Sequence, residues 1–307
     1  MRRRVARPLR PLTSLEPAPP GLAPGREVWL KREDVHELGA FKWRGALPTL
    51  ESYRAAGATE VVTASTGNHG AATAWAAARL GLSAAVYVPV GASAAKTALI
   101  EAQGAELRRM GADLDEAKEL GQAYAAERGL PFFEDGAEPA QVAGYRAIGE
   151  EILAQASAPP ASVVVPVGNG ALIAGVGEGL GGLTEVVAVA AQEAPVMALS
   201  YHLGRAAECD RSATFADGLA VRVAIPSAVQ LVSRVADRFL LVSERELAEA
   251  TAAYFRAGIR AEGAAAAALA ALPRLDPDGP VVLVVTGRNI DETLLRRTLV
   301  DPASFSD

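Results

Sequence analysis

The sequence predicts an α/β protein in which parallel strands are covered by helices on both faces. Two observations carry this prediction: short runs of β-branched residues recur along the chain, and alanine-rich segments separate them. A short apolar run between turn residues is typical of a strand buried inside a parallel sheet. Strand and helix in alternation are what such a sheet requires, because each parallel crossover needs room for a helix.

Seven runs are expected to be strands. They begin at residues 28, 60, 84, 162, 186, 239 and 280, and read VWLK, EVVTAS, AAVYVPV, SVVVPVG, VVAVAAQE, FLLVS and PVVLVVTG. Helices are expected between them, because alanine and straight-chain residues have high helix propensity. The clearest are GAATAWAAARLG from 70, DEAKELGQAYAAERG from 115, ALIAGVGEGL from 171 and EGAAAAALAAL from 262.

Length and charge narrow the class of protein. With 307 residues, of which 50% are hydrophobic, the chain has enough apolar material for one large domain or two lobes. The net charge of -6 gives no broad positive field that would attract nucleic acid or anionic lipid. The arginines of the opening MRRRVARPLRPL are the exception. We expect a solvated arm there, because prolines interrupt it and no apolar signal segment follows.

Cysteine and histidine usage bears on compartment and metals. The single cysteine, Cys209, permits no internal disulfide, and no apolar run is long enough to span a bilayer. We therefore expect a cytoplasmic protein without membrane contact. Three histidines without HExxH or CxxC spacing do not make an ordinary zinc site, so we expect no metal.

The stretch KREDVHELGAFKWRGAL, residues 31–47, places Lys42 among Phe41, Trp43 and Arg44 at the start of a predicted helix. An apolar niche flanked by a cation favours a neutral amine, which is the form that acts as nucleophile or base. A lysine that lies along aromatic rings with its ammonium in water is nevertheless the commoner arrangement. Lys42 alone is therefore an open candidate.

Three loops rich in small and polar residues follow predicted strands directly: STGNHG at 65–70, VGNGALIAG at 167–175 and TGRNID at 286–291. Ligands of open α/β sheets bind at such loops, beyond the carboxyl ends of the strands. The hydroxyl, amide and imidazole groups of the first loop suit a carboxylate, although the same residue types also cap helices. The second loop turns backbone N–H groups and a helix start toward one point. This suits a phosphate, although a tight turn without any ligand fits as well.

Together these stretches resemble the fold-type-II pyridoxal-phosphate enzymes, which have a two-lobed, tryptophan synthase β-like fold, and within them the serine/threonine dehydratase (ammonia-lyase) family. FKWRGA is similar to the family's lysine stretch, STGNHG to its S-x-G-N-H loop and GNGAL to its phosphate loop. TFADGLAV at 214–221 is similar to A-D-G-x-A-V, and TGRN to S-G-G-N. Each match is weak alone, but five in the family's order make coincidence improbable.

The resemblance implies a role for each matching residue. Lys42 carries the cofactor, pyridoxal 5′-phosphate, as a Schiff base and takes the α-proton of the substrate. Asn68 bonds the cofactor's 3′-hydroxyl, and Thr286 faces the pyridine nitrogen. The substrate carboxylate is held by Ser65, Thr66 and His69. The phosphate is bound by backbone N–H groups of one loop, Gly168, Asn169, Gly170, Ala171 and Leu172.

A hydroxyl at the pyridine nitrogen favours elimination, because a carboxylate there would keep the ring protonated and make a deeper electron sink. The resemblance thus implies a threonine or serine ammonia-lyase, which converts a hydroxy-amino acid to a 2-oxo acid and ammonia by β-elimination. A relative such as 3-hydroxyaspartate stays open as substrate. Two other functions stay open: a threonine synthase-like β- or γ-replacement enzyme, and a non-catalytic relative that only binds the cofactor.

Several residues depart from the family pattern. Asn169 and Ala171 stand where glycine is favoured, and asparagine follows a left-handed backbone better than alanine does. Thr66 stands where racemases carry a serine, which disfavours racemisation. Met197 and Leu199 stand where a magnesium site needs oxygen ligands.

Three further positions bear on function. Tyr145 and Arg146 stand where dehydratases have Gln-Gly and are closer to threonine synthases, which is the best argument for that alternative. Arg288 has no counterpart in the family pattern. Glu262, at a predicted helix start, is more often a structural residue than a catalytic one, although it could face the cofactor.

The resemblance also implies an organisation. We expect a smaller domain at 46–140, a larger cofactor-binding domain made of 1–45 and 141–307, and the cofactor between them. A homodimer that acts on a small amino acid is expected on the same ground. The chain ends soon after the last predicted strand and helix, so we expect no regulatory extension.

Overall fold

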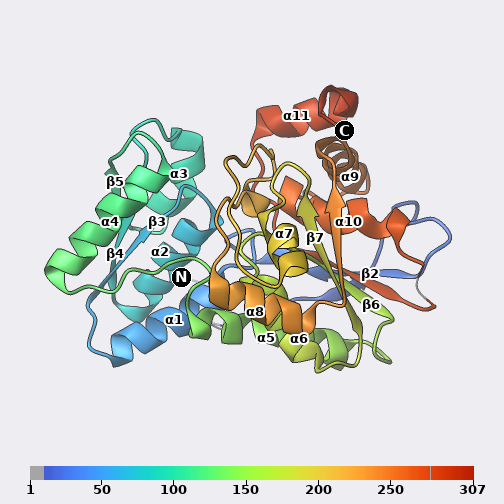
Figure 1. Cartoon of the computed structure of the whole chain (residues 1–307), viewed down its shortest axis with the longest axis horizontal. Helices are drawn as coiled ribbons and strands as arrows, with labels where there is room; N and C mark the ends of the chain where they lie inside the picture. The colour runs from blue at the N-terminus through green and yellow to red at the C-terminus, as the bar shows by residue number, and fades with distance from the viewer. Residues whose placement is uncertain (1–9, 277) are drawn as a thin grey trace, which may run out of the picture.

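A computed structural model describes residues 10–276 and 278–307 of the chain as two sheets with helices packed on them (Figure 1). The part of the arginine-rich arm up to residue 9 lies outside the described residues. The strands of both sheets are parallel, apart from one antiparallel strand at an edge. The predicted α/β class is confirmed.

Within the described residues, the larger sheet has six strands in the order β1-β2-β9-β6-β7-β8, and the smaller sheet has three in the order β3-β4-β5. The strands are β1 Leu15–Pro17, β2 Val28–Arg32, β3 Glu60–Ala64, β4 Ser83–Val88, β5 Glu106–Arg109, β6 Ser162–Pro166, β7 Glu185–Ala191, β8 Arg238–Val242 and β9 Val281–Val285. All seven predicted strands are present. The sequence pattern missed β1 and β5, because these short edge strands contain no β-branched residue.

The helices connect these strands and cover the sheets. The α-helices are α1 Trp43–Ala55, α2 Asn68–Leu80, α3 Ala94–Glu101, α4 Leu114–Arg128, α5 Pro139–Gln155, α6 Ala171–Leu180, α7 Val196–Leu203, α8 Pro226–Val235, α9 Glu244–Arg256, α10 Gly263–Ala271 and α11 Glu292–Val300. Short 3-10 turns are η1 Glu33–Val35, η2 Asp217–Leu219, η3 Leu272–Arg274 and η4 Pro302–Ser304. None of the helices in the described part of the chain is long and apolar enough to cross a membrane.

The two sheets lie in different lobes (Figure 1). The three-stranded sheet lies with α2, α3 and α4 on one side of the molecule, and the six-stranded sheet with α5, α6 and α8 to α11 on the other. Helix α1 packs against both α2 and α5 and so joins the lobes. The domain limits given above, 46–140 against 1–45 with 141–307, stay a prediction.

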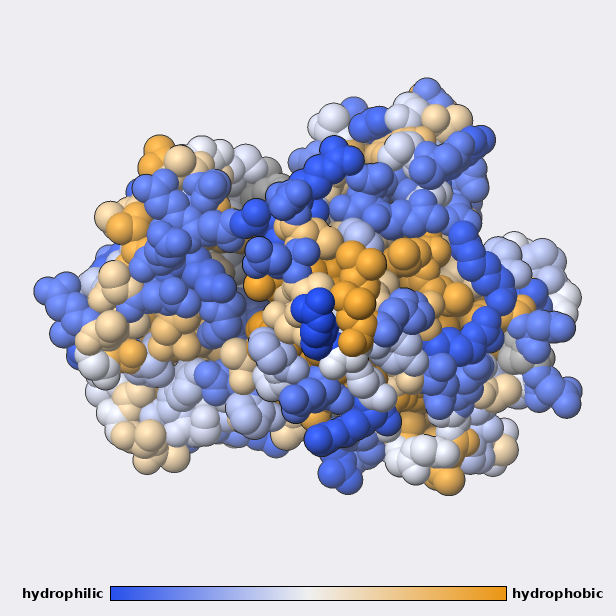
Figure 2. All heavy atoms as spheres, in the orientation of Figure 1, coloured by the Kyte–Doolittle hydropathy of each residue, from blue (hydrophilic) through white to orange (hydrophobic). Residues whose placement is uncertain are grey.

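The two lobes differ in the surface that they present in Figure 2. Polar and charged side chains cover much of the smaller lobe, whereas apolar side chains gather on the larger lobe where Figure 1 draws α7 and β7. Helix α7 contributes Leu199 and Leu203, whose side chains are 44% and 55% exposed.

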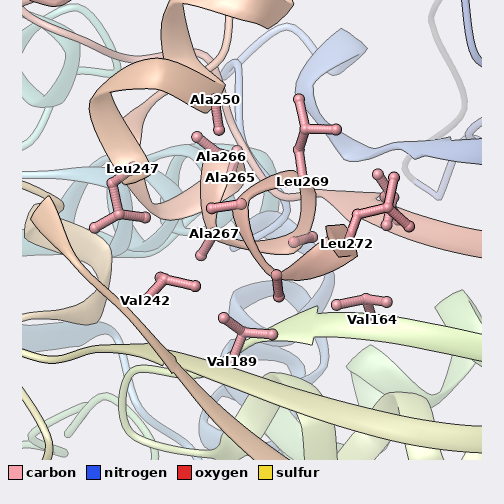
Figure 3. Close-up of a cluster of buried hydrophobic side chains, with 14 of the residues drawn as sticks. Val164, Val189, Val242, Leu247, Ala250, Ala265, Ala266, Ala267, Leu269 and Leu272 are labelled. Atoms are coloured by element: carbon pink, nitrogen blue, oxygen red, sulfur yellow. The ribbon is translucent and has the colours of Figure 1, made fainter. Parts of the chain in front are cut away.

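Helix α10 is buried along its whole length. A helix that is apolar on all sides has no solvent face and must lie inside the protein. Figure 3 shows its alanines between Val164 and Val189 of the strands and Leu247 of α9. At its start, the backbone N–H of Glu262 donates to the carbonyl of Gly287, 3.0 Å away. The core thus holds the beginning of α10 beside the carboxyl end of β9.

A buried network of charges fixes the beginning of α1. The Arg44 guanidinium donates to both carboxylate oxygens of Glu33 at 2.7 and 3.0 Å, and to both of Glu151 at 2.7 and 2.8 Å. Lys31 donates to Glu151 at 2.6 Å and to the Thr13 carbonyl at 2.8 Å. Two cations therefore balance two anions, so these buried charges are paired. The network ties α1 to β2, η1 and α5, two residues after Lys42.

Replacing Arg44 by methionine should lower the free energy of unfolding by about 3–5 kcal/mol, because Glu33 would keep a buried charge without its partner. Urea unfolding followed by circular dichroism measures this loss. Arg146→Met is the matched control, since Arg146 pairs only with exposed Glu150 on the same helix and should cost about 0.5 kcal/mol or less. Equal losses in the two variants would contradict a structural role for the network.

Candidate active site

The loops singled out in the sequence meet at the carboxyl ends of parallel strands. Strand β2 leads to the turn that carries Lys42, β9 to Thr286 and β6 to the glycine-rich loop, and these three strands are neighbours in the larger sheet. The STGNHG loop follows β3 in the smaller sheet. It reaches the others through Asn68, whose Oδ1 accepts a 2.7 Å hydrogen bond from Asn289 Nδ2. Side chains that follow strands of both sheets therefore meet in one region.

Lys42 stands directly before α1, with its side chain 15% exposed. Its Nζ donates to Asp135 Oδ2 at 2.5 Å and lies 5.2 Å from the centre of the Phe41 ring. The expected apolar, cation-flanked niche is wrong, because the group that contacts the amine is an acid and the Arg44 guanidinium is turned into the buried network. Trp43 is likewise a core residue, stacked on His36.

Asp135 is the residue that the sequence analysis missed. Besides Lys42, it accepts a 2.7 Å hydrogen bond from Gln141 Nε2, and its Oδ1 lies 3.6 Å from His69 Nδ1. Burial alone would raise the pKa of this carboxyl, but the charge of Lys42 and the hydrogen bonds from Lys42 and Gln141 outweigh burial and lower it. Asp135 is thus held as a carboxylate. The run FFEDG, an acid pair before a glycine, was the only signal in the sequence.

His69 is buried and bonded to the protein. Its Nε2 lies 3.2 Å from the Phe133 carbonyl and 3.1 Å from the Thr63 hydroxyl. A carbonyl only accepts, so Nε2 carries the proton, and Nδ1 of the neutral ring presents a lone pair toward Asp135. Burial lowers the pKa of the imidazole, which favours this neutral form. The role of holding a substrate carboxylate requires a protonated ring and stays a prediction.

Ser65 and Thr66 lie half-buried before α2. Gly67 occupies the N-cap position of this helix, and no side chain caps it. The capping explanation for this polar cluster therefore does not hold; the Ser65 hydroxyl accepts instead from the backbone N–H of Gly67 at 3.2 Å. An uncapped helix start offers its N–H groups to an anion such as a carboxylate.

Asn68 and Glu262 bond across the two lobes. Asn68 Nδ2 lies 3.1 Å from each carboxylate oxygen of Glu262. Burial raises the pKa of Glu262 to about 7, against the hydrogen bond from Asn68 and the charge of Lys42, which lower it. Glu262 therefore contacts Asn68, which is predicted to bind the cofactor. Its side chain does not cap α10, so its role is not a purely local structural one.

Thr286 has a hydroxyl without a partner. Its side chain is buried, and within the described residues its Oγ1 makes no hydrogen bond. Its backbone carbonyl accepts from the N–H of Phe41 at 3.0 Å, which places Thr286 beside the segment that carries Lys42. A buried hydroxyl without a partner is costly, so a bound ligand is the natural candidate to satisfy it.

The glycine-rich loop leads into α6, as expected for a phosphate site. Gly170 has a left-handed backbone with φ 92°. In the described part of the chain, every residue with positive φ is a glycine. Asn169 therefore does not have a left-handed backbone, and asparagine in place of glycine causes no backbone strain at this position. Asn169 Oδ1 accepts from the N–H of Ala171 at 3.1 Å, so this N–H is not free for a ligand.

Gly168 cannot be replaced without a steric clash, since a Cβ there would lie 2.3 Å from the Gly218 carbonyl oxygen. Leu172 follows in the first turn of the helix.

Arg288 and Tyr145 have structural roles. The Arg288 guanidinium donates to the carbonyls of Asp34 at 2.7 Å and His36 at 3.4 Å, and so holds η1 beside the end of β9. Tyr145 is fully buried, its hydroxyl accepts from Gln141 at 3.0 Å, and its ring packs 5.0 Å from that of Phe41. In the described ranges, no group of three or more His, Cys, Asp or Glu residues could hold a metal ion.

The pKa of Glu262 predicts a pH dependence of stability. A folded pKa of about 7, above the usual 4.5, means that the folded protein holds a proton that the unfolded chain has lost in this window. Unfolding free energy should therefore fall between about pH 4.5 and pH 7, by on the order of 3 kcal/mol relative to Glu262→Gln. Urea unfolding of the cofactor-free proteins across this range measures the difference. Substitution of exposed Glu249 by glutamine serves as control, and an equal pH profile for wild type and Glu262→Gln would contradict the prediction.

Comparisons with known proteins identify the family of this chain. The family of pyridoxal-phosphate dependent enzymes matches residues 7–287. The chain is 34% identical over 286 residues to an L-threonine ammonia-lyase of Thermotoga maritima, covering 90% of this chain and 70% of the relative. It is 34% identical over 275 residues to an L-threonine ammonia-lyase of Geobacter sulfurreducens, covering 87% and 68%.

Among solved structures, the processed form of threonine deaminase isoform 2 from Solanum lycopersicum superposes with a TM-score of 0.89 at 27% identity, covering 96% of this chain and 89% of that one. The fold-type-II resemblance stated from the sequence is confirmed. The chain belongs to the family of pyridoxal-phosphate dependent enzymes.

Proposed function

We propose that the protein is a threonine/serine ammonia-lyase, which converts a hydroxy-amino acid to a 2-oxo acid and ammonia by β-elimination. The single observation that carries the proposal is the buried hydroxyl of Thr286, which has no partner among the described residues and lies beside the Lys42 segment. A neutral hydroxyl at the ring nitrogen of the cofactor suits elimination. The threonine ammonia-lyases to which the chain is 34% identical support the same reaction.

The residues of the site fit pyridoxal phosphate. Lys42 offers an amine on a side chain that is 15% exposed, and Thr286 offers a hydroxyl without a partner among the described residues. The start of α6 behind Gly170 offers backbone N–H groups to a phosphate, although the N–H of Ala171 is already bonded to Asn169. Asn68 is held in place by Glu262, whose two carboxylate oxygens each lie 3.1 Å from its Nδ2, and its amide is proposed to bond the cofactor's 3′-hydroxyl.

Bound pyridoxal phosphate supplies an electron sink for the pair left behind when the α-proton is removed. We assign the removal of that proton to Lys42. Asp135, 2.5 Å from Nζ, stabilises the amine once it carries the proton, in the way that a carboxylate supports a general base. The uncapped start of α2, with Ser65 and Thr66, is proposed to orient the substrate through its carboxylate.

The threonine synthase alternative loses its best argument. Tyr145, which suggested it, is fully buried and bonded to Gln141, and Arg146 pairs with Glu150 at the surface. These contacts account for both residues as packing and surface charge rather than as parts of a second substrate pocket. We therefore keep the synthase only as an outcome of the assay below.

Location and assembly follow as proposals from the same family membership. We infer a cytoplasmic protein, since one cysteine gives no sign of an oxidising compartment. We infer a homodimer, and the apolar side chains that gather in Figure 2 where Figure 1 draws α7 and β7 support a contact there. Sedimentation analysis of the purified protein tests the dimer; a monomer at all concentrations would contradict it.

Wild-type protein given L-threonine or L-serine should release 2-oxobutanoate or pyruvate with one ammonia per oxo acid. Lys42→Ala should lower kcat by about a thousandfold or more and remove the visible absorption of the bound cofactor, because the amine that carries the cofactor and moves the proton is lost. Coupled assays for oxo acid and ammonia measure both effects.

Lys118→Ala is the matched control, since this lysine pairs with Glu134 at the surface and should keep full activity. A yellow, active Lys42→Ala protein would refute the assignment of Lys42. Formation of threonine from O-phosphohomoserine, without ammonia from either hydroxy-amino acid, would establish the synthase instead.

A further inference from the structure

The contact between Lys42 and Asp135 places a fixed negative charge inside the site. Asp135 Oδ2 accepts from Lys42 Nζ at 2.5 Å, and its Oδ1 accepts from Gln141 Nε2 at 2.7 Å. Gln141 is fully buried and also bonds the backbone N–H of Gly136, next to Asp135. The carboxylate is therefore held in one orientation by a residue that has no freedom to move away.

This charge lies within reach of a substrate side chain. A base must come within about 3 Å of the proton donor that it serves, so the reacting carbon lies close to Lys42 Nζ. An atom 2.5 Å from the same nitrogen is then about 6 Å or less from that carbon. The next carbon of an amino acid carries its side-chain substituent into this range.

The remaining charges around Lys42 do not offset Asp135. The charges of Asp217 and Lys42 both act on the Glu262 carboxyl, so Asp217 and Glu262 are two further acids of this region. The neutral ring of His69 presents a lone pair on the side of Asp135 and no donor. A second carboxylate on the substrate would therefore meet acids.

Arg288, the arginine of the TGRN stretch, does not receive such a carboxylate because it is bonded elsewhere. The Arg288 guanidinium donates to the carbonyls of Asp34 and His36, and so ties together the loop that precedes Lys42. The contacts that fix it are those of a structural clamp. Arg288, which the sequence resemblance left without a role, thus gives no receptor for an acidic side chain.

We propose that Asp135 determines specificity by repelling amino acids with an anionic side chain, so that the substrates are neutral hydroxy-amino acids and not 3-hydroxyaspartate. This inference rests on the proposed function for the reaction, but the charge selection itself does not need turnover. A like charge near a fixed carboxylate in a partly desolvated site raises the free energy of the bound state and weakens binding.

The test uses L-asparagine and L-aspartate, which have nearly the same shape, differ by one charge and lack a leaving group at the β-carbon. Their dissociation constants for the holoenzyme are measured from the change in the cofactor's visible absorption. For wild type we expect aspartate to bind at least about tenfold more weakly than asparagine, a difference of about 1.4 kcal/mol. In Asp135→Asn this ratio should fall to about threefold or less, because only the charge is removed.

Three variants make the result specific. Asp135→Glu keeps the charge and should keep the discrimination. Asp135→Ser removes the charge with a smaller side chain and serves if the asparagine variant does not fold. Glu134→Gln removes a neighbouring charge that is paired with Lys118 at the surface, and should leave the ratio as in wild type.

The proposal is overturned if wild type binds aspartate as well as asparagine, or if loss of the Asp135 charge leaves the ratio unchanged. It is also overturned if Glu134→Gln changes the ratio as much as Asp135→Asn does. Turnover of L-threonine in the same wild-type preparation tests the proposed reaction separately. Discrimination without turnover would refute the lyase and leave the role of Asp135 standing.

Discussion

The buried bonds of Arg44 are the interaction on which the rest of the site depends. Its guanidinium joins Glu33, which follows β2, to Glu151 of α5, and thereby fixes the first turn of α1 against the larger sheet. Lys42 stands directly before that turn, so the position of its amine is also defined. A reacting amine gains from such rigidity because small displacements of a catalytic group cost much of its rate. These charges can be buried because they are paired. They hold Lys42 in position rather than add net stability.

The architecture brings together what the chain keeps far apart. Parallel strands end on one side of a sheet, and β2, β9 and β6 are neighbours there, so the loops that follow them share one region. The smaller sheet adds Asn68, which bonds Glu262 although 194 residues separate them. Alanine-rich α10 makes this contact possible, since its small side chains allow it to lie buried against the strands (Figure 3). The two lobes are thus linked by a few polar contacts close to the loops that follow the strands.

The sequence was informative where structure is local. Buried strands follow from runs of apolar residues between small and polar turn residues, so all seven predicted strands are present. Short edge strands β1 and β5 have no such pattern. Asp135 was missed because its role depends on hydrogen bonds with Lys42, 93 residues earlier in the sequence, and with Gln141. The prediction for the surroundings of Lys42 was wrong for the same reason. Residues adjacent in sequence, such as Trp43, lie in the core, and the acid that contacts the amine is Asp135, from a distant part of the chain.

Lys42 is the lysine that we propose carries the cofactor. Reduction of the holoenzyme with sodium borohydride makes the link between a lysine and the cofactor's aldehyde permanent, and peptide mass spectrometry then locates the added pyridoxyl phosphate. The sequence contains only three other lysines, Lys31, Lys96 and Lys118, so the assignment is unambiguous. We expect the modification on Lys42 in stoichiometric amount. Modification of another lysine, with Lys42 unmodified, would contradict it.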